Sequence, residues 1–410
     1  MTNPWFNRTV IGAGITSFLA DAGYEMATAI LPAFLLTLGL PPDAAARAVG
    51  AIEGTADLLS NVVKIAVGWY SDRIGKRKAF VVSGYVLTGT AFALCALAVG
   101  WPLVLLAKCL AWIGKGIRGP LRNAIITDAV DPQHRGKAFG FHRAGDTLGA
   151  ILGPLLGFAL IRYWLPESWF SAPDEPYRVV FLLTLIPGLG AALAFALLIR
   201  EQRFNPKPGL RLGASIRMLP AGFRKYLVGI GLFGLGDFSH TLLILAATLL
   251  LTPEYGKVDA AAIGFALYAW KNACGALAAF PAGWLGDKLG HRPVLIGGYL
   301  LGVATMLGFA ILFASQTASI GWLAVLFALA GVYLAVEESL EPAMAADLTP
   351  DPTVRGTAFG VLATVNGLGD FVASVGVGSL FVLGGEVAFG AAAGLMLLGT
   401  MWMLRIRSVI

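Results

Sequence analysis

Charged residues are scarce in this sequence. Only 13% of its 410 residues are Asp, Glu, Lys or Arg, while 57% are hydrophobic. A soluble domain carries about 25% charged residues, so the composition excludes an ordinary soluble protein and places most of the chain in lipid. Cysteine is also rare. Cys95, Cys109 and Cys274 all fall in apolar segments without C-x-x-C spacing, which excludes a disulfide framework and a cysteine metal site.

Catalytic signatures are missing as well. The sequence contains no H-E-x-x-H, no G-x-S-x-G and no Walker loop, so nothing indicates a hydrolase or a nucleotide-driven enzyme. We therefore expect no enzymatic activity, no cofactor and no metal. No small-residue cleavage site follows the first apolar run, and we expect that run to be an uncleaved first span.

Twelve apolar runs are long enough to cross a bilayer, which takes about 17–25 residues each. The chain is predicted to be an all-α membrane protein with two six-helix domains, residues 1–199 and 223–410, joined by a polar cytoplasmic linker, 200–222. The predicted spans are 9–37, 46–67, 79–99, 102–126, 137–162, 178–199, 223–251, 259–282, 293–315, 320–346, 356–383 and 386–405.

The basic residues set the predicted orientation. Nineteen Lys and Arg residues lie in the even-numbered loops and at the termini, against four in the odd-numbered loops. Cytoplasmic loops are enriched in Lys and Arg, so both termini are predicted to be cytoplasmic. The same bias accounts for the net charge of +6 without a nucleic-acid partner.

A short charged loop occurs twice. The stretch from Gly68 to Lys78 recurs from Gly283 to Arg292, with Asp72 and Asp287 215 residues apart. Residues 135–140 and 355–360 form a second related pair, R-G-K-A-F-G and R-G-T-A-F-G. Repeated motifs half a chain apart indicate a duplicated six-span unit.

The loop form G-x-x-x-D-[RK]-x-G-[KH]-R resembles the loop signature of the major facilitator superfamily of transporters. This resemblance covers nearly the whole chain and implies a transporter that works by alternating access. Gly149, Gly153, Pro154 and Gly157 in span 5 look like the motif of the superfamily's proton-coupled exporters. At the least, these glycines are expected to form a close-packing helix face.

The charged loops are predicted to act as a conformational latch at the cytoplasmic membrane edge, where ion pairs tie helices together. A role in substrate contact is the alternative. The predicted latch residues are Gly68, Asp72, Arg73, Gly75, Asp128, Arg135, Asp287 and Arg355.

Charges inside spans are costly and indicate function or pairing. Asp21, Glu25 and Asp237 are the predicted proton-coupling residues. The predicted substrate-binding residues are Lys115, Arg118, Glu337, Glu341 and His240. Buried ion pairing is the alternative for Asp21, Glu25, Lys115 and Arg118, and a simple hydrogen-bonding role is the alternative for His240. Lys108 is either structural or linked to Glu53, and both readings remain open.

These observations predict a monomeric transporter in the cell inner membrane that exchanges a small anionic or zwitterionic organic solute for protons, in the export direction. Its partners would be the substrate, protons and the lipid bilayer. A proton-coupled importer and a passive uniporter are the closer alternatives. A membrane receptor or an enzyme built on a transporter fold is the more distant one.

Overall fold

A computed structural model describes residues 5–165, 167–202, 204–206, 209, 211–238 and 241–405. These residues form helices and contain no β-strand. The α-helices are α1 (Arg8–Thr37), α2 (Pro42–Ile74), α3 (Lys78–Ala91), α4 (Trp101–Ala129), α5 (Arg135–Ala159), α6 (Glu175–Leu183), α7 (Leu185–Leu198), α8 (Leu212–Met218), α9 (Ala221–Gly234), α10 (Thr241–Leu289), α11 (His291–Ala314), α12 (Ile320–Leu348), α13 (Arg355–Leu380) and α14 (Gly385–Met403). Short helical turns are η1 (Phe92–Leu97), η2 (Pro132–His134), η3 (Leu160–Trp164), η4 (Glu167–Trp169), η5 (Pro352–Val354) and η6 (Phe381–Leu383).

Two related glycines end or precede helices at the repeated loops. Gly75 follows α2 with φ 71°, and its N–H donates to the Ser71 carbonyl. Gly290 precedes α11 with φ 94°. Glycine adopts positive φ without the steric cost that a Cβ brings. The chain therefore reverses sharply at the same place in both repeats.

Eight of the described helical segments are long and apolar enough to cross a membrane. The other four predicted spans correspond to α2, α4, the region of α9 and early α10, and late α10. Helices α2 and α4 carry several ionisable side chains, which lowers their hydropathy. They are nevertheless long helices at the predicted positions, with 33 and 29 residues.

The predicted seventh span, 223–251, is divided. Helix α9 ends at Gly234, and a non-helical stretch follows up to Phe238 before α10 begins. The predicted break between spans seven and eight is a kink inside α10, where Gly256 has φ 76° and ψ 165°. The kink places the helix reversal on a glycine, the residue for which this backbone conformation is not strained.

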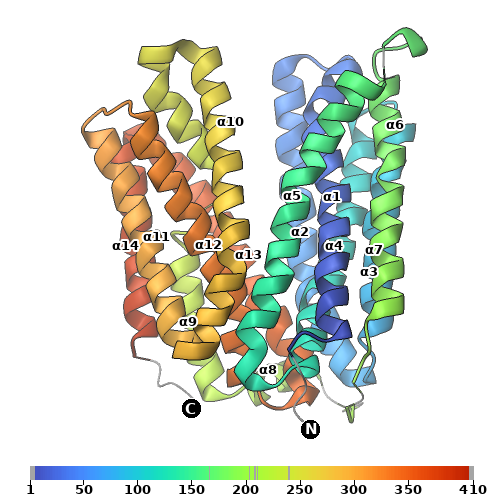
Figure 1. Cartoon of the computed structure of the whole chain (residues 1–410), viewed down its shortest axis with the longest axis vertical. Coiled ribbons are helices and arrows are strands. Elements are labelled where there is room, and N and C mark those ends of the chain that lie inside the picture. The colour runs from blue at the N-terminus through green and yellow to red at the C-terminus, as the bar shows by residue number, and fades with distance from the viewer. Residues whose placement is uncertain are drawn as a thin grey trace. The chain divides into compact units, whose positions relative to one another are not determined.

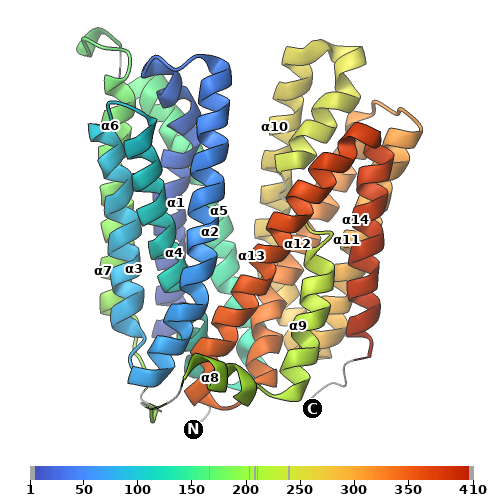
Figure 2. The same cartoon turned by 180° about the vertical axis from the view of Figure 1, so that it is seen from behind.

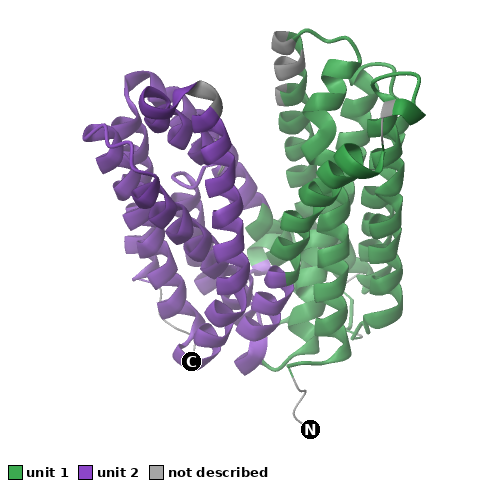
Figure 3. Cartoon of the chain, turned by 45° about the horizontal axis from the view of Figure 1, so that its top comes forward, with its two compact units in different colours: residues 1–131, 145–217, 351–363 green, residues 132–144, 218–350, 364–410 purple. Residues whose placement is uncertain are grey.

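The chain forms two compact units that do not follow chain order (Figure 3). Unit 1 contains residues 1–131, 145–217 and 351–363, and unit 2 contains residues 132–144, 218–350 and 364–410. Each half therefore contributes a 13-residue segment to the unit built mainly by the other half. Helix α5 begins in unit 2 and continues in unit 1, while α13 begins in unit 1 and continues in unit 2. The domain boundaries at the 200–222 linker stay a prediction.

Within unit 1, α1 packs against α7, and α4 packs against α2 and α3 (Figures 1 and 2). Aromatic side chains fill its core, with Phe34 and Phe181 in edge-to-face contact at 5.0 Å between ring centroids. Within unit 2, α12 packs against α10 and α11, and α14 packs against α11 and α9. Phe309 and Phe389 stack there at 4.9 Å.

Candidate functional site

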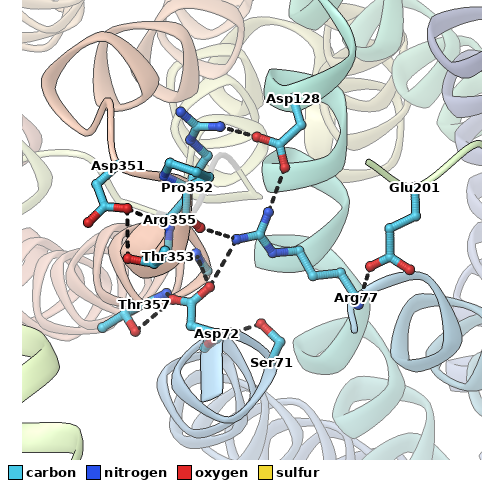
Figure 4. Close-up of polar contacts among 12 residues, drawn as sticks. Ser71, Asp72, Arg77, Asp128, Glu201, Asp351, Pro352, Thr353, Arg355 and Thr357 are labelled. Atoms are coloured by element: carbon cyan, nitrogen blue, oxygen red, sulfur yellow. Dashed lines mark hydrogen bonds and ion pairs between the residues drawn. The ribbon is translucent and has the colours of Figure 1, made fainter. Parts of the chain in front are cut away.

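Asp72 caps the first turn of α13 within unit 1 (Figure 4). Its side chain is 2% exposed and accepts hydrogen bonds from the backbone N–H groups of Gly356, at 3.0 Å, and Thr357, at 2.7 Å. The Thr357 hydroxyl donates a third at 3.0 Å. A carboxylate at a helix N-terminus satisfies otherwise unpaired N–H groups and interacts favourably with the helix dipole. Asp72 therefore binds the 351–363 segment to α2.

Arg77 connects this aspartate to α4. Its guanidinium is fully buried and contacts Asp72 at 3.0 Å, Asp128 at 2.6 Å and the Pro352 carbonyl at 2.6 Å. Arg355 also pairs with Asp128. Two arginines thus face two aspartates, which balances the buried charge, as buried ions require. Burial raises the pKa of the Asp72 carboxyl, and Arg77 and the Thr357 N–H oppose that rise.

Arg77 was not among the predicted latch residues. Arg73 is exposed, and its guanidinium lies 5.7 Å from the Trp69 ring. Arg77 occupies the buried position because Gly75 reverses the chain before it. The sequence signal for this role is the place of Arg77, the second basic residue after Gly75. The prediction of the latch residues did not use it. At Gly68 a Cβ would lie 2.3 Å from the Gly356 carbonyl oxygen, so this glycine permits the α2–α13 contact.

Unit 2 holds the second copy of this arrangement. Asp287 accepts hydrogen bonds from the N–H groups of Gly136, at 2.8 Å, and Lys137, at 3.0 Å, and so caps α5. Arg135 pairs with Asp347 at 2.8 Å. Asp347 lies 219 residues after Asp128 and was not among the predicted residues. The duplication itself is the signal that points to it.

His291 takes the position in unit 2 that Arg77 takes in unit 1. Its Nδ1 lies 2.6 Å from Asp347 Oδ2, and its Nε2 lies 3.1 Å from Asp287 Oδ1. The ring is 8% exposed. Both copies therefore place one basic side chain between two aspartates, but the side chains differ in chemistry.

The interior of unit 1 contains a buried arginine on α4. Arg118 is 2% exposed, and its Nη2 lies 3.9 Å from Asp21 Oδ1, beyond hydrogen-bonding distance. Its Nε and Nη1 are buried without a hydrogen-bond partner among the described residues. The guanidinium carbon lies 4.5 Å from the centre of the Tyr85 ring. Arg118 is thus a desolvated cation with donors left over.

Two lysines on α4 lie against aromatic rings. Lys108 Nζ pairs with Glu53 at 2.8 Å and lies 3.8 Å from the Trp112 ring, so the structure shows the link to Glu53 that the sequence left open. Lys115 Nζ donates to the Tyr24 hydroxyl at 3.3 Å. Lys115 also lies 4.9 Å from the Trp112 ring. Cation–π contacts of this kind stabilise desolvated ammonium groups.

The glycine motif of α5 packs on the charged turn of α1. A Cβ at Gly149 would lie 3.1 Å from the Asp21 Cβ, and one at Gly153 would lie 3.1 Å from the Glu25 Cβ. Gly157 continues the same face against Met26. The predicted exporter motif and the predicted coupling residues therefore meet at one helix crossing. Small residues allow this close approach.

Carboxyl groups in unit 1 also meet one another. A side-chain hydrogen bond joins Asp21 to Asp146 on α5, and Asp146 accepts a hydrogen bond from Ser17 at 3.1 Å. Asp146 was not among the predicted coupling residues.

Unit 2 buries carboxyl groups beside tyrosines. Asp237 is 6% exposed and accepts a hydrogen bond from the Tyr333 hydroxyl at 3.0 Å. Glu341 is 2% exposed and accepts from the Tyr299 hydroxyl and from Asn366 Nδ2, the latter at 2.6 Å. Both oxygens of Glu341 are thus already engaged.

Glu337 has a spare acceptor. It is 9% exposed, and its Oε2 has no hydrogen-bond partner among the described residues. Lys271 on α10 is 3% exposed, so a buried cation is also present in this unit. The predicted substrate contact His240 lies outside the described residues.

The chain matches the family model of the Major Facilitator Superfamily over residues 13–241 and 227–409. It is 33% identical to an uncharacterized MFS-type transporter of Methanocaldococcus jannaschii over 383 residues. This match covers 93% of this chain and 91% of that protein. Its fold is similar to the Escherichia coli fucose:proton symporter (TM-score 0.76, 16% identity, 98% of each chain). It is also similar to the human organic anion transporter MFSD10 (TM-score 0.69, 18% identity, 97% of this chain and 99% of that one). This chain is therefore a multi-pass membrane transporter of the Major Facilitator Superfamily.

Proposed function

We propose that this transporter moves a small anionic or zwitterionic organic solute in exchange for protons. The observation that carries the proposal is Arg118, a buried arginine whose Nε and Nη1 have no hydrogen-bond partner among the described residues. An unpaired buried donor on a charged group is costly, and a planar guanidinium fits a carboxylate or phosphate. A substrate anion bound at Arg118 would satisfy both nitrogens.

Lys115 supports the choice of an anion, since it lies on the same helix three residues before Arg118. Its ammonium contacts Tyr24 and Trp112 and forms no ion pair among the described residues, so it can bind a further anion. Glu337 and Glu341 stay proposed contacts for a basic group of a zwitterionic substrate. His240 stays a proposed contact as well.

Proton coupling is supported by buried carboxyl groups in each of the two units. Asp21 shares a hydrogen bond with Asp146. Glu25 lies one helical turn further along α1. Asp237 is a buried carboxyl group in the other unit. We propose Asp21, Glu25 and Asp237 as the residues that bind and release the transported proton.

The export direction is supported by the glycine motif from Gly149 to Gly157, which packs on the α1 turn that carries Asp21 and Glu25.

We propose that the chain works as a monomer in the cell inner membrane with both termini cytoplasmic. The latch residues of the two charged loops would control the exchange between conformational states. Import and passive uniport remain the alternatives, and a test of gradient dependence separates them.

Replacing Asp21 with asparagine, or Glu25 with glutamine, is expected to abolish transport driven by a pH gradient. Neither variant side chain can take up and release a proton. Exchange of substrate at equal pH on both sides is expected to survive, because it needs no net proton transfer. Both activities are measured in proteoliposomes after a ligand has been found by its thermal stabilisation of the purified protein.

The matched control is Glu254→Gln, an exposed glutamate that should keep both activities. If both α1 variants keep gradient-driven transport, coupling does not reside on α1 and Asp237 becomes the remaining candidate. If the wild-type chain transports equally well with and without a pH gradient, it is a uniporter.

Replacing Arg118 with alanine is expected to weaken substrate binding by about 100-fold, or ~3 kcal/mol, because a charged hydrogen-bonding partner is lost in a desolvated site. Binding is measured by titration calorimetry with the identified ligand. Arg162→Ala removes an exposed arginine and should leave affinity unchanged. Equal affinity of the wild type and Arg118→Ala would rule out the anion site.

A further inference from the structure

The basic residue between two aspartates is an arginine in unit 1 and a histidine in unit 2. Arg77 donates through Nη2 to Asp72 at 3.0 Å and through Nη1 to Asp128 at 2.6 Å. His291 lies between Asp287 and Asp347. A guanidinium stays protonated at every physiological pH, whereas an imidazole titrates near neutrality.

Both ring nitrogens of His291 face carboxylate oxygens. Nδ1 lies 2.6 Å from Asp347 and Nε2 lies 3.1 Å from Asp287. A carboxylate only accepts hydrogen bonds, and a neutral imidazole has only one N–H to donate. The protonated ring alone can donate to both aspartates. In the neutral ring, one nitrogen lone pair would face a carboxylate at hydrogen-bonding distance.

The other charged groups around His291 come from two elements, α5 and α11. On α5, Arg135 pairs with Asp347 at 2.8 Å and Lys137 Nζ lies 3.9 Å from Asp287. On α11 itself, Arg292 points to α14, where it donates to the carbonyls of Met403 and Leu404. Arg135 and Lys137 still balance the two aspartates when the histidine is neutral. Loss of the proton therefore weakens the cluster without leaving a buried aspartate unpaired.

We infer that His291, Asp287 and Asp347 form a proton-binding site, and that the bound proton strengthens the attachment of residues 132–144 to α10 and α12. Asp287 caps the first turn of α5, and Asp347 holds Arg135, so both aspartates bind this segment directly. The site is separate from the coupling carboxylates proposed above and does not depend on the substrate. It makes one of the two latches sensitive to pH and leaves the other insensitive.

The sign of the effect follows from linkage. The folded chain binds a proton at His291 more tightly than the unfolded chain, because two carboxylates stabilise the imidazolium. The stabilisation is therefore present at low pH and is lost as pH rises and the folded-state histidine deprotonates. An arginine at this position keeps its charge throughout.

The test is thermal unfolding of the purified full-length chain over a pH series, with no ligand added. His291→Gln should melt a few degrees Celsius below the wild type at low pH, and the two curves should converge at high pH. The melting temperature of His291→Arg should instead rise further above that of the wild type as pH rises. Arg77→His should add a second pH-sensitive site in unit 1, so that its melting temperature falls further below the wild type as pH rises.

His134→Gln is the matched control, because His134 contacts only the carbonyl of its neighbour Gln133 among the hydrogen bonds of the described chain. Its melting curve should parallel the wild type. Imidazole nitrogen NMR gives a second readout: at a pH of about 8, where a free imidazole is mostly neutral, the resonances assigned by loss in His291→Gln should show both nitrogens protonated. A wild type and a His291→Gln variant whose melting temperatures differ by the same amount at every pH overturn the inference, as does a ring that is already neutral at a pH of about 8.

Discussion

Replacing Arg77 with methionine is expected to destabilise the chain by about 3–5 kcal/mol, the usual cost of removing one partner of a buried ion pair. The substitution leaves Asp72 and Asp128 with one arginine, Arg355, in a site where Asp72 is 2% exposed. Methionine keeps the apolar length of the side chain, so the loss reports charge more than volume. Thermal unfolding of the purified protein measures the effect, and transport should be abolished.

Two comparisons make this prediction specific. Arg73→Met removes an exposed arginine four residues earlier and should change stability by no more than about 0.5 kcal/mol. Adding Asp72→Asn to Arg77→Met should recover part of the loss, because the uncompensated carboxylate is removed with its partner. Equal stability of Arg77→Met and Arg73→Met would contradict the assignment of Arg77 as the buried bridge.

Gly283→Ala is the second substitution with a large expected effect. A Cβ there would lie 2.0 Å from the Gly136 carbonyl oxygen and 2.6 Å from its carbonyl carbon. Backbone atoms cannot move aside as a flexible side chain does, so the α5–α10 contact must open. We expect a loss of about 3 kcal/mol, at the upper end for overpacking. Loss of transport should accompany it, since Asp287 would no longer reach the α5 N–H groups.

Gly297→Ala is the control, and it is expected to raise stability where Gly283→Ala lowers it. Gly297 is an exposed glycine in α11, and a Cβ there meets nothing within 4 Å. Alanine in an unobstructed helix position is favoured over glycine by about 0.5–1 kcal/mol. The two variants should therefore shift the melting temperature in opposite directions. A stable, active Gly283→Ala variant would show that the close crossing is not required.

The repeated loop was readable from sequence because its residue spacing is strict. The duplication of Asp72 as Asp287 predicted two related turns, and the structure places both aspartates at the N-terminus of a helix from the other half. What the pattern did not reveal is which basic residue each aspartate meets. Arg73 and Arg77 look alike in sequence, but Arg73 lies exposed in the last turn of α2, whereas Arg77 follows the left-handed Gly75 and is buried.

The buried charges show the same limit. The helix positions of Asp21, Glu25 and Arg118 followed from span assignment alone. Their partners come from other helices, and hydropathy carries no information about which helices touch. Asp146 was visible as a charge in span 5, yet its contact with Asp21 depends on the packing of α5 on α1. The break between α9 and α10 was also missed, because Gly234 and Gly236 lie in an otherwise continuous apolar run.

The exchange of 13-residue segments between the two units has a consequence for synthesis on the ribosome. The hydrogen bond from the Gly356 N–H to Asp72 cannot form until Gly356 has been translated, 284 residues after Asp72. At about 5–20 residues per second, this delay is roughly 14–57 s. During that interval the first half is in the membrane with its α13 cap missing, and Arg77 has Asp72 and Asp128 but not the Pro352 carbonyl. A nascent chain arrested shortly before codon 350 should therefore expose Asp72 to water, whereas the completed and released chain should bury it.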